Sequence, residues 1–266
     1  MDKTLILCAD DFGQNKSISD GILELAQRSR LSAVSCMVNG ASWPYGIDDL
    51  KSCDVELGLH LNLTHGASFS AFWGQRFPSL FKLLLNLYRL DQDALYHEIL
   101  AQIEKFKADV GFYPQFIDGH QHVHQLPIVR DALFKALDQL PNRPWLRSTY
   151  TSDNQRLSHF INWKRWILYF LGGRAFQRLL QQKGYRTNKD FSGDYTFSED
   201  INYPKRFRRF LAELPHLGLI MCHPGKVSVD STDSIASIRP LEFQYFQSEA
   251  FLKDLKETGV ELGKLD

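Results

Sequence analysis

The stretch TLILCADDFG, at residues 4–13, sets an apolar run directly before two adjacent aspartates. A short continuous apolar run is typical of a strand that is buried on both faces. The segment 15–30 that follows places Ile18, Ile22 and Ala26 at helical spacing, which predicts a helix. The chain therefore opens with a strand, a loop and a helix, and the two carboxylates stand at the carboxyl end of the strand.

The same alternation of strand and helix continues along the chain. Further strands are predicted at 33–38, 55–63, 115–118, 145–147, 217–222 and 260–262, and further helices at 91–111, 126–140, 203–214 and 241–258. Buried strands that alternate with helices favour crossover connections and a parallel sheet. We expect an α/β fold with residues 1–266 in one domain, a size that is common among α/β barrels.

Four further segments connect these elements. The pattern predicts a mixed turn or short helix at 42–51, a long loop and then a helix at 64–89, a loop at 183–202, and at 158–182 either one long basic helix or two helices separated by Gly172 and Gly173. The long loop in 64–89 is a candidate lid.

Composition and charge exclude several classes of protein. The 31 basic and 31 acidic residues cancel, so no global field would draw the chain to nucleic acid or to an acidic membrane. The first apolar run is too short for the core of a signal peptide, and basic residues interrupt the longest apolar candidate, 163–180, so no membrane span is expected. The cysteines have no CxxC spacing, which favours reduced thiols in a cytoplasmic protein; they are Cys8, Cys36, Cys53 and Cys222.

Asp or His stands at or just beyond the end of four predicted strands. The four segments are ADDFG at 9–13, GLHLN at 58–62, DGHQHVH at 118–124 and MCHPG at 221–225. In parallel α/β folds this rim holds the active site. A lone histidine is more often a hydrogen-bonded structural residue, but four segments that converge on one rim predict a functional site.

These residue types fit a catalytic metal. Such an ion takes about three imidazole or carboxylate ligands and leaves positions open for water and substrate. Asp11, His60 and one of His120, His122 or His124 would supply that set. If the strand continues through HQHVH, its three histidines share one face, and a single ion cannot accept all of them. His120 is preferred because it is nearest the strand end, with His124 second.

Two further residues are candidates for acid–base chemistry. Adjacent aspartates can divide the work, since one can bind metal while the other accepts a proton from a water that the metal acidifies. The alternative for Asp10 is a cap on the next helix. His223 follows the strand LGLIMC, and a histidine with a pKa near neutral can protonate a leaving amine. The alternative for His223 is a buried histidine bonded to a backbone carbonyl.

The ordered set of motifs carries a family resemblance. ADDFG, VNG at 38–40, GLHLNLT, FIDGHQHVH and LIMCHPG follow one another as in the YdjC-like carbohydrate deacetylases, which the chain resembles over nearly its whole length. That family looks related to the polysaccharide deacetylases. The resemblance therefore implies an irregular (β/α) barrel similar to the TIM barrel, with an Asp-His-His metal site.

The resemblance also implies a role for individual residues. Asp11, His60 and His120 would bind one divalent ion, zinc or magnesium, while Asp10 would be the base and His223 the acid. The residues left to orient the ligands or contact the substrate are Asp118, His122, His124, Asn62 and Arg147. The implied reaction is attack of metal-activated water on the N-acetyl group of an amino sugar, an oligosaccharide or a glycolipid.

The segment 145–190 matches the family pattern least and is expected to be a variable insertion of loop and helix. Its aromatic residues interleave with arginine and lysine over 158–182. The simpler interpretation is a helix packed on the barrel with its cations in solvent, in a cytoplasmic protein. The alternative is an interfacial face that reaches a lipid-linked glycan at the inner membrane. A homodimer is a further option that the sequence leaves open.

Two other function classes remain open at this point. A metal-dependent phosphoesterase on a similar barrel would also use Asp and His ligands, but it usually needs two or three metals, for which His122 and His124 would be spare ligands. A non-catalytic carbohydrate-binding protein is disfavoured because all the expected ligands, the base and the acid are present.

Overall fold

The computed structural model describes residues 3–70, 76–151, 172–195, 197–198, 200–228 and 233–265. Its elements in chain order are β1 (Lys3–Phe12), α1 (Lys16–Gln27), β2 (Ala33–Cys36), α2 (Ile47–Lys51), β3 (Glu56–Leu61), α3 (Leu80–Leu85), the 3₁₀ helix η1 (Leu87–Arg89), α4 (Gln92–Val110), β4 (Phe116–Gly119), the 3₁₀ segment η2 (His120–Gln125), α5 (Pro127–Leu137), β5 (Trp145–Leu146), α8 (Arg174–Lys183), β6 (Phe191–Ser192), α9 (Tyr203–Glu213), β7 (Gly218–Cys222), α10 (Arg239–Gln247), α11 (Glu249–Thr258) and β8 (Val260–Leu262).

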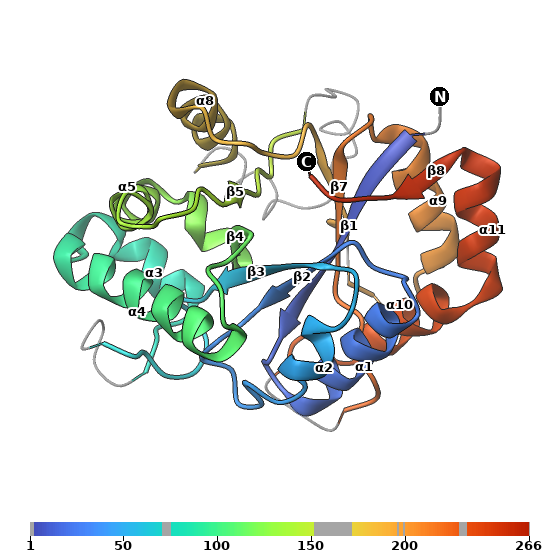
Figure 1. Cartoon of the computed structure of the whole chain (residues 1–266), viewed down its shortest axis with the longest axis horizontal. Coiled ribbons are helices and arrows are strands. Elements are labelled where there is room, and N and C mark those ends of the chain that lie inside the picture. The colour runs from blue at the N-terminus through green and yellow to red at the C-terminus, as the bar shows by residue number, and fades with distance from the viewer. Residues whose placement is uncertain are drawn as a thin grey trace.

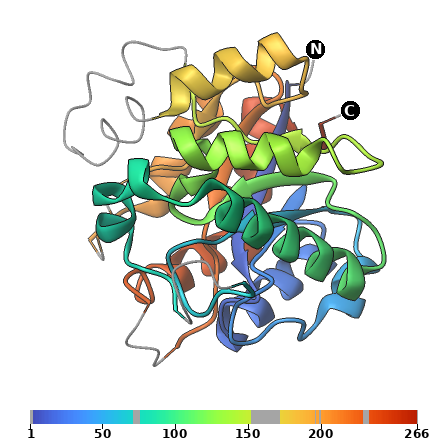
Figure 2. The same cartoon turned by 90° about the vertical axis from the view of Figure 1, so that its left-hand side faces the viewer.

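The strands of the described residues all pair in parallel, in the order β5-β4-β3-β2-β1-β7-β6, and β8 pairs with the first residues of β1. Helices surround the curled sheet on its outer side (Figure 1). Turned by 90°, the molecule shows α4, α5 and α8 side by side over the β4 and β5 end (Figure 2). The expected α/β fold with a parallel sheet is confirmed.

The two edge strands, β5 and β6, are joined by an irregular segment. The backbone N–H of Leu146 at the end of β5 donates to the carbonyl of Arg186. The side chain of Asn188 accepts from the N–H of Ser148 and donates to the carbonyls of Ser148 and Asp190, next to β6. A side-chain amide thus supplies the bonds that a regular ladder would make, and the barrel is irregular at this seam, as the resemblance implied.

Local signals explain where the main helices begin and end. Asn15 caps α1 by accepting from the N–H of Ile18. Asp91 caps α4, and the helix ends at Gly111, whose φ of 96° is in the region that favours glycine. These boundaries agree with the sequence-based prediction to within a few residues.

Two predicted elements differ from the structure. The predicted loop 183–202 contains β6, which was missed because two paired residues are too short to show an alternating pattern. The predicted helix 241–258 is two helices, because Ser248 has an extended backbone (ψ 159°) and its hydroxyl caps α11. Of the predicted basic helix 158–182, residues up to 171 lie outside the described part of the chain, and α8 forms its end. No described helix is long and apolar enough to cross a membrane.

An aromatic stack fills the inside of the barrel at the amino ends of β4 and β5. Phe116 of β4 and Trp145 of β5 are fully buried and stack with ring centroids 4.4 Å apart at 15°. They belong to a separate apolar cluster that also includes Ile6 of β1 and Leu219 of β7. Gly58 on β3 faces this stack, since a Cβ there would lie 2.4 Å from the Phe116 ring.

Gly58→Ala is expected to destabilise the fold by about 1–3 kcal/mol, because the added methyl overpacks a ring that Trp145 already holds in place. Urea unfolding would measure the change in the free energy of unfolding. Phe116→Leu in the Gly58→Ala background should recover part of the loss, because the smaller side chain makes room. An unchanged unfolding midpoint for Gly58→Ala would contradict the close approach.

Candidate active site

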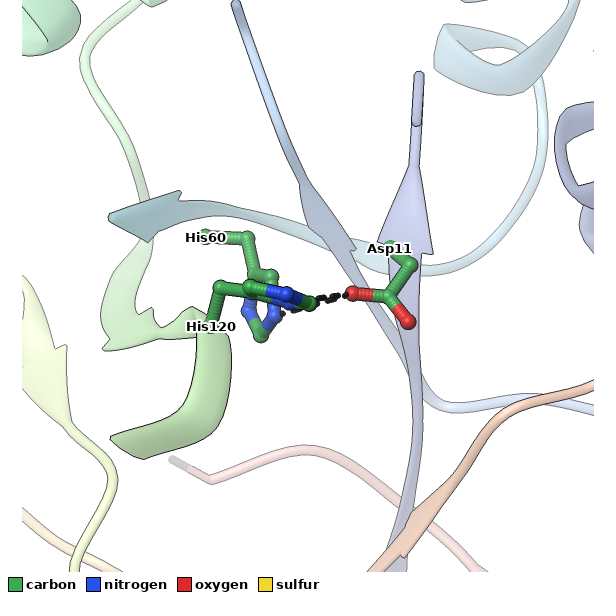
Figure 3. A group of neighbouring side chains, drawn as sticks. All are labelled: Asp11, His60 and His120. Carbon is green, nitrogen blue, oxygen red and sulfur yellow. Dashed lines mark hydrogen bonds and ion pairs between the residues drawn. The ribbon is translucent and has the colours of Figure 1, made fainter. Parts of the chain in front are cut away.

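Asp11, His60 and His120 meet at the carboxyl ends of β1, β3 and β4 (Figure 3). Their ligand atoms all lie within 4.8 Å of one another. The Oδ1 atom of Asp11 is 3.3 Å from Nε2 of His60 and 2.9 Å from Nδ1 of His120. One carboxylate oxygen and two imidazole nitrogens thus converge on one point, and this donor set suits a divalent ion.

The backbone at Asp11 turns its carboxylate away from that of Asp10. The pairing of β1 with β2 shifts register between Ala9 and Phe12, and Asp11 itself has a φ of 71°. Few non-glycine residues adopt this left-handed conformation, and strain of this kind gathers at functional sites. The side chains of the two adjacent aspartates therefore point to two different places.

His60 is held by contacts on its far side. Its Nδ1 lies 2.7 Å from Oδ1 of Asp118 and 3.0 Å from the hydroxyl of Ser35. A proton on Nδ1 shared with Asp118 leaves the lone pair of Nε2 facing Asp11, which is the tautomer that a metal ligand needs. Asp118 therefore lies where a residue that orients a ligand was expected.

The electrostatics of the cluster favour a positive charge among the three side chains. Burial alone would lower the pKa of His60, but Asp118, Asp10 and Asp11 raise it to about 10. Burial would raise the pKa of Asp11, yet Arg239 and His120 hold it well below its usual range. Either a proton on His60 or a bound divalent cation would reduce the excess of negative charge around these side chains. The set of one carboxylate and two imidazoles suits the cation.

Asp10 is paired with a buried arginine. Arg147, fully buried beyond the end of β5, donates from Nη1 and Nη2 to the two oxygens of Asp10, each at 2.6 Å. Its Nη2 also lies 2.5 Å from Oδ2 of Asp118 and 2.9 Å from the sulfur of Cys8. Asp10 does not cap α1, because Asn15 does.

The second group with metal-like spacing, Cys8, Asp10 and Asp118, encloses this guanidinium. Arg147 lies between the two buried carboxylates and bonds to both, so its guanidinium takes the place that an ion in this group would need. Burial raises the pKa of the Cys8 thiol well above its usual range, which keeps it from being an anionic ligand.

The histidines after His120 do not lie on one strand face. Gln121 and His122 have φ values of 53° and 59°, so the chain winds into η2 and does not continue as the strand that would have placed all three histidines on one face. His124 donates from Nε2 to the carbonyl of Arg147 at 2.9 Å, and burial lowers its pKa to about 4. The ring of His122 packs edge-on against Phe191. Tight winding separates both from the ligand group.

His223 stands just beyond β7, with its ring edge-on to that of Phe197 at 5.5 Å. Burial lowers its pKa to about 4, so the ring is neutral at pH 7 and not poised near neutrality as the sequence suggested. The backbone N–H of His223 donates a hydrogen bond of 2.6 Å to Oε2 of Glu242. Sequence did not predict this partner.

Asn62 lies in the loop that follows β3. Its side chain donates to the carbonyl of His65 and to Asn39, and it accepts from the N–H groups of Thr64 and His65. Asn62 thus shapes this loop, and the loop brings the ring of His65 to 6.2 Å from that of His120.

Sequence-based reasoning missed Ser35, Arg239 and Glu242. Ser35 lies on β2 and bonds to Asp118 at 2.5 Å, and Arg239 bonds to Oδ2 of Asp11 at 2.8 Å. Ser35 is part of an ordinary apolar strand, and Arg239 and Glu242 lie on a helix far along the chain. The spacing of three residues places Arg239 and Glu242 on one turn of a helix, but this spacing alone does not indicate a site.

The irregular barrel is shared with known structures. A candidate cellobiose-phosphate cleavage protein from Enterococcus faecalis V583 superposes with a TM-score of 0.76 at 18% identity, covering 98% of this chain and 97% of that one. A family 4 carbohydrate esterase from Streptomyces lividans gives a TM-score of 0.52 at 10% identity, covering 99% and 93%. At these identities the likeness concerns the fold, and it confirms the expected polysaccharide deacetylase-like barrel.

Proteins with similar sequences include carbohydrate deacetylases. A carbohydrate deacetylase of Danio rerio is 30% identical over 54% of this chain and 51% of its own length. A chitooligosaccharide deacetylase of Yersinia enterocolitica is 25% identical over 99% of this chain and 98% of its own. The match thus spans about half the length of the first relative and nearly all of the second. The family model described as YdjC-like protein matches residues 4–257, so this chain belongs to the YdjC-like family.

Proposed function

We propose that this protein is a metal-dependent hydrolase that removes the N-acetyl group from an N-acetylated amino sugar, oligosaccharide or glycolipid. The observation that carries the proposal is the group formed by Asp11, His60 and His120, with the Asp10–Arg147 pair next to it. The names of the relatives, carbohydrate deacetylase and chitooligosaccharide deacetylase, support the same reaction class.

Asp11, His60 and His120 are proposed to hold one zinc or magnesium ion. When bound, such an ion polarises the acetamide carbonyl and makes a water molecule more acidic. The contact of Asp118 with Nδ1 of His60 keeps the other ring nitrogen free for this purpose.

Asp10 is proposed to take the proton of the attacking water. Each carboxylate oxygen has two lone-pair directions, so the two bonds from Arg147 fix the plane of Asp10 and still leave acceptor capacity. Because the guanidinium is always charged, it is a permanent hydrogen-bond donor to Asp10.

His223 is proposed to protonate the departing nitrogen. The neutral ring must first gain a proton, since its pKa is about 4 in this surrounding. Negative charge that develops on the substrate opposes the effect of burial and favours the protonated ring. His223 would take a proton from solvent and give it to the departing amine, while the proton that Asp10 takes from water would return to solvent after acetate and the amine leave.

A phosphoesterase with two metals fits less well. Among the described residues the second candidate group encloses Arg147, and His124 is bonded to a backbone carbonyl. Neither offers a second ion the ligands that it needs.

The function is tested by an acetate-release screen over N-acetylated hexosamines and their oligomers, with zinc or magnesium added to metal-free protein. Acetate release that depends on the metal is the expected result. Binding of these sugars without any acetate release would favour a carbohydrate-binding protein, and release of inorganic phosphate from sugar phosphates by a two-metal form would favour the phosphoesterase.

Asp10→Asn is expected to lower kcat by roughly 10²–10⁴-fold, because the amide cannot accept the proton of water. The metal should stay bound, with a much smaller loss of affinity than removal of a ligand causes, since Asp10 is not among the three ligands. Asp11→Asn is the matched variant, and it should weaken metal binding itself. Metal titration and acetate release separate the two effects, and an active Asp10→Asn enzyme would remove Asp10 as the base.

His223→Gln is expected to lower kcat on an N-acetyl sugar by roughly 100-fold, because glutamine cannot deliver a proton to the leaving nitrogen. An aryl acetate such as 4-nitrophenyl acetate should lose much less, since its phenolate leaves without protonation. Asp10→Asn should slow both substrates, because both need water attack. Equal losses on the two substrates for His223→Gln would contradict the role of acid.

A further inference from the structure

Arg239 joins a proposed metal ligand to a second buried carboxylate. It is the first residue of α10 and is only 2% exposed. Its Nη2 donates to Oδ2 of Asp11 at 2.8 Å, and its Nε lies 2.6 Å from Oδ2 of Asp233. The guanidinium fork is rigid, so Asp233 on one side fixes where Arg239 meets Asp11 on the other.

The contact with Arg239 determines which oxygen of Asp11 faces the histidines. Oδ2 is taken by the guanidinium, while Oδ1 is the atom near His60 and His120. The left-handed backbone of Asp11 gives a conformation that needs support from its surroundings. Arg239 provides such support from a helix outside the strand.

Glu242, one turn further along α10, makes a comparable contact with the other side of the site. It is fully buried and accepts the backbone N–H of His223 on Oε2 and the hydroxyl of Tyr195 on Oε1. The loop that carries His223 is therefore tied to α10 through its main chain at the residue proposed as the acid.

Close packing leaves this loop little freedom. The N–H of Gly225 donates to the carbonyl of Arg239, and the N–H of Lys226 donates to the carbonyl of Ser17 near the start of α1. A Cβ on Gly21 of α1 would lie 2.8 Å from Gly225, so the loop passes directly between α1 and α10. Gly21 is thus required by this close approach, and a Cβ on Gly225 of the HPG motif would lie only 3.2 Å from the side chain of Arg239.

We propose that Arg239 and Glu242 are positioning residues which hold the two halves of the active site from one turn of α10: Arg239 presents one oxygen of Asp11 to the metal, and Glu242 sets the position of His223. The proposal deepens the function proposed above and rests on it for the roles of Asp11 and His223. Neither residue touches the reacting atoms in this scheme.

The Arg239 half is tested by metal affinity alone, on metal-free protein titrated with zinc against a chromogenic chelator. Arg239→Lys and Arg239→Gln are expected to weaken zinc binding by about 10- to 100-fold. A positive charge near a cation repels it, so charge alone would make Arg239→Gln bind zinc more tightly. Weaker binding in both variants is the result that positioning predicts, and unchanged or tighter binding in either would overturn it.

The zinc experiment includes an independent test variant and a control variant. Asp233→Asn keeps Arg239 and Asp11 but weakens the contact that fixes Arg239, so it should cause a smaller loss of zinc affinity. This variant tests the same role should Arg239→Gln fold poorly. Arg28→Gln is the matched control, because it removes an arginine that makes an exposed ion pair with Glu24, and its zinc affinity should not change.

The Glu242 half is tested by the leaving-group comparison. Glu242→Leu should lower kcat on an N-acetyl sugar and spare 4-nitrophenyl acetate, as His223→Gln does, with zinc affinity unchanged. Glu242→Gln keeps one acceptor oxygen and should recover part of the activity. Because the two residues act through one group, Glu242→Leu should add little to His223→Gln. Equal losses on both substrates, a change in zinc affinity, or full additivity would each overturn the assignment.

The outcomes also separate this proposal from the proposed function. Zinc affinity needs no substrate, so a wild type that binds zinc but releases no acetate from any sugar would end the deacetylase proposal and leave the Arg239 result standing. Metal-dependent acetate release with wild-type zinc affinity in all the Arg239 and Asp233 variants would keep the function and end the positioning role of Arg239.

Discussion

The candidate site depends on the guanidinium of Arg147, buried between two carboxylates inside the barrel. It makes ion pairs with Asp10 of β1 and Asp118 of β4 from its place beyond the end of β5. Removing one partner from such a buried group leaves an uncompensated charge, which costs several kcal/mol. Asp118 in turn contacts His60 and Ser35, so the orientation of a proposed ligand depends on the same ion pair.

The local backbone then divides the two adjacent aspartates. In a regular strand neighbouring side chains point to opposite faces, and the irregular pairing of β1 with β2 changes their directions further at the strand end. Asp10 reaches Arg147, while Asp11 reaches His60 and His120. A base and a ligand can therefore come from consecutive residues without competing for the same position.

Sequence could predict the parts of this site that are local. The apolar runs located β1, β3, β4 and β7, and the polar residue at the end of each run was enough to bring Asp11, His60, His120 and His223 to one rim. The winding of η2 was not predictable from HQHVH, because the alternation of residues fits a strand equally well. The low pKa of His223 comes from burial by segments distant in sequence, as does its bond to Glu242.

The balance of buried charge gives a reason why a divalent ion suits this centre. Among the residues that the structure describes, four aspartates line it, Asp10, Asp11, Asp118 and Asp233, and two arginines, Arg147 and Arg239, contact them. With neutral histidines this leaves an excess of two negative charges. The pKa of His60 is raised because of this excess, and the proton that His60 then holds supplies one of the two positive charges needed to balance the group.

An ion with two positive charges would balance the group and free His60 to act as a neutral ligand. Once the group is balanced, the negative charge that develops on the substrate oxygen meets no surplus of carboxylate. The same two arginines that fix the positions of Asp10 and Asp11 supply half of the positive charge that the four aspartates need, and the ion would supply the other half. The contacts that set the geometry of the proposed reaction therefore also contribute to its charge balance.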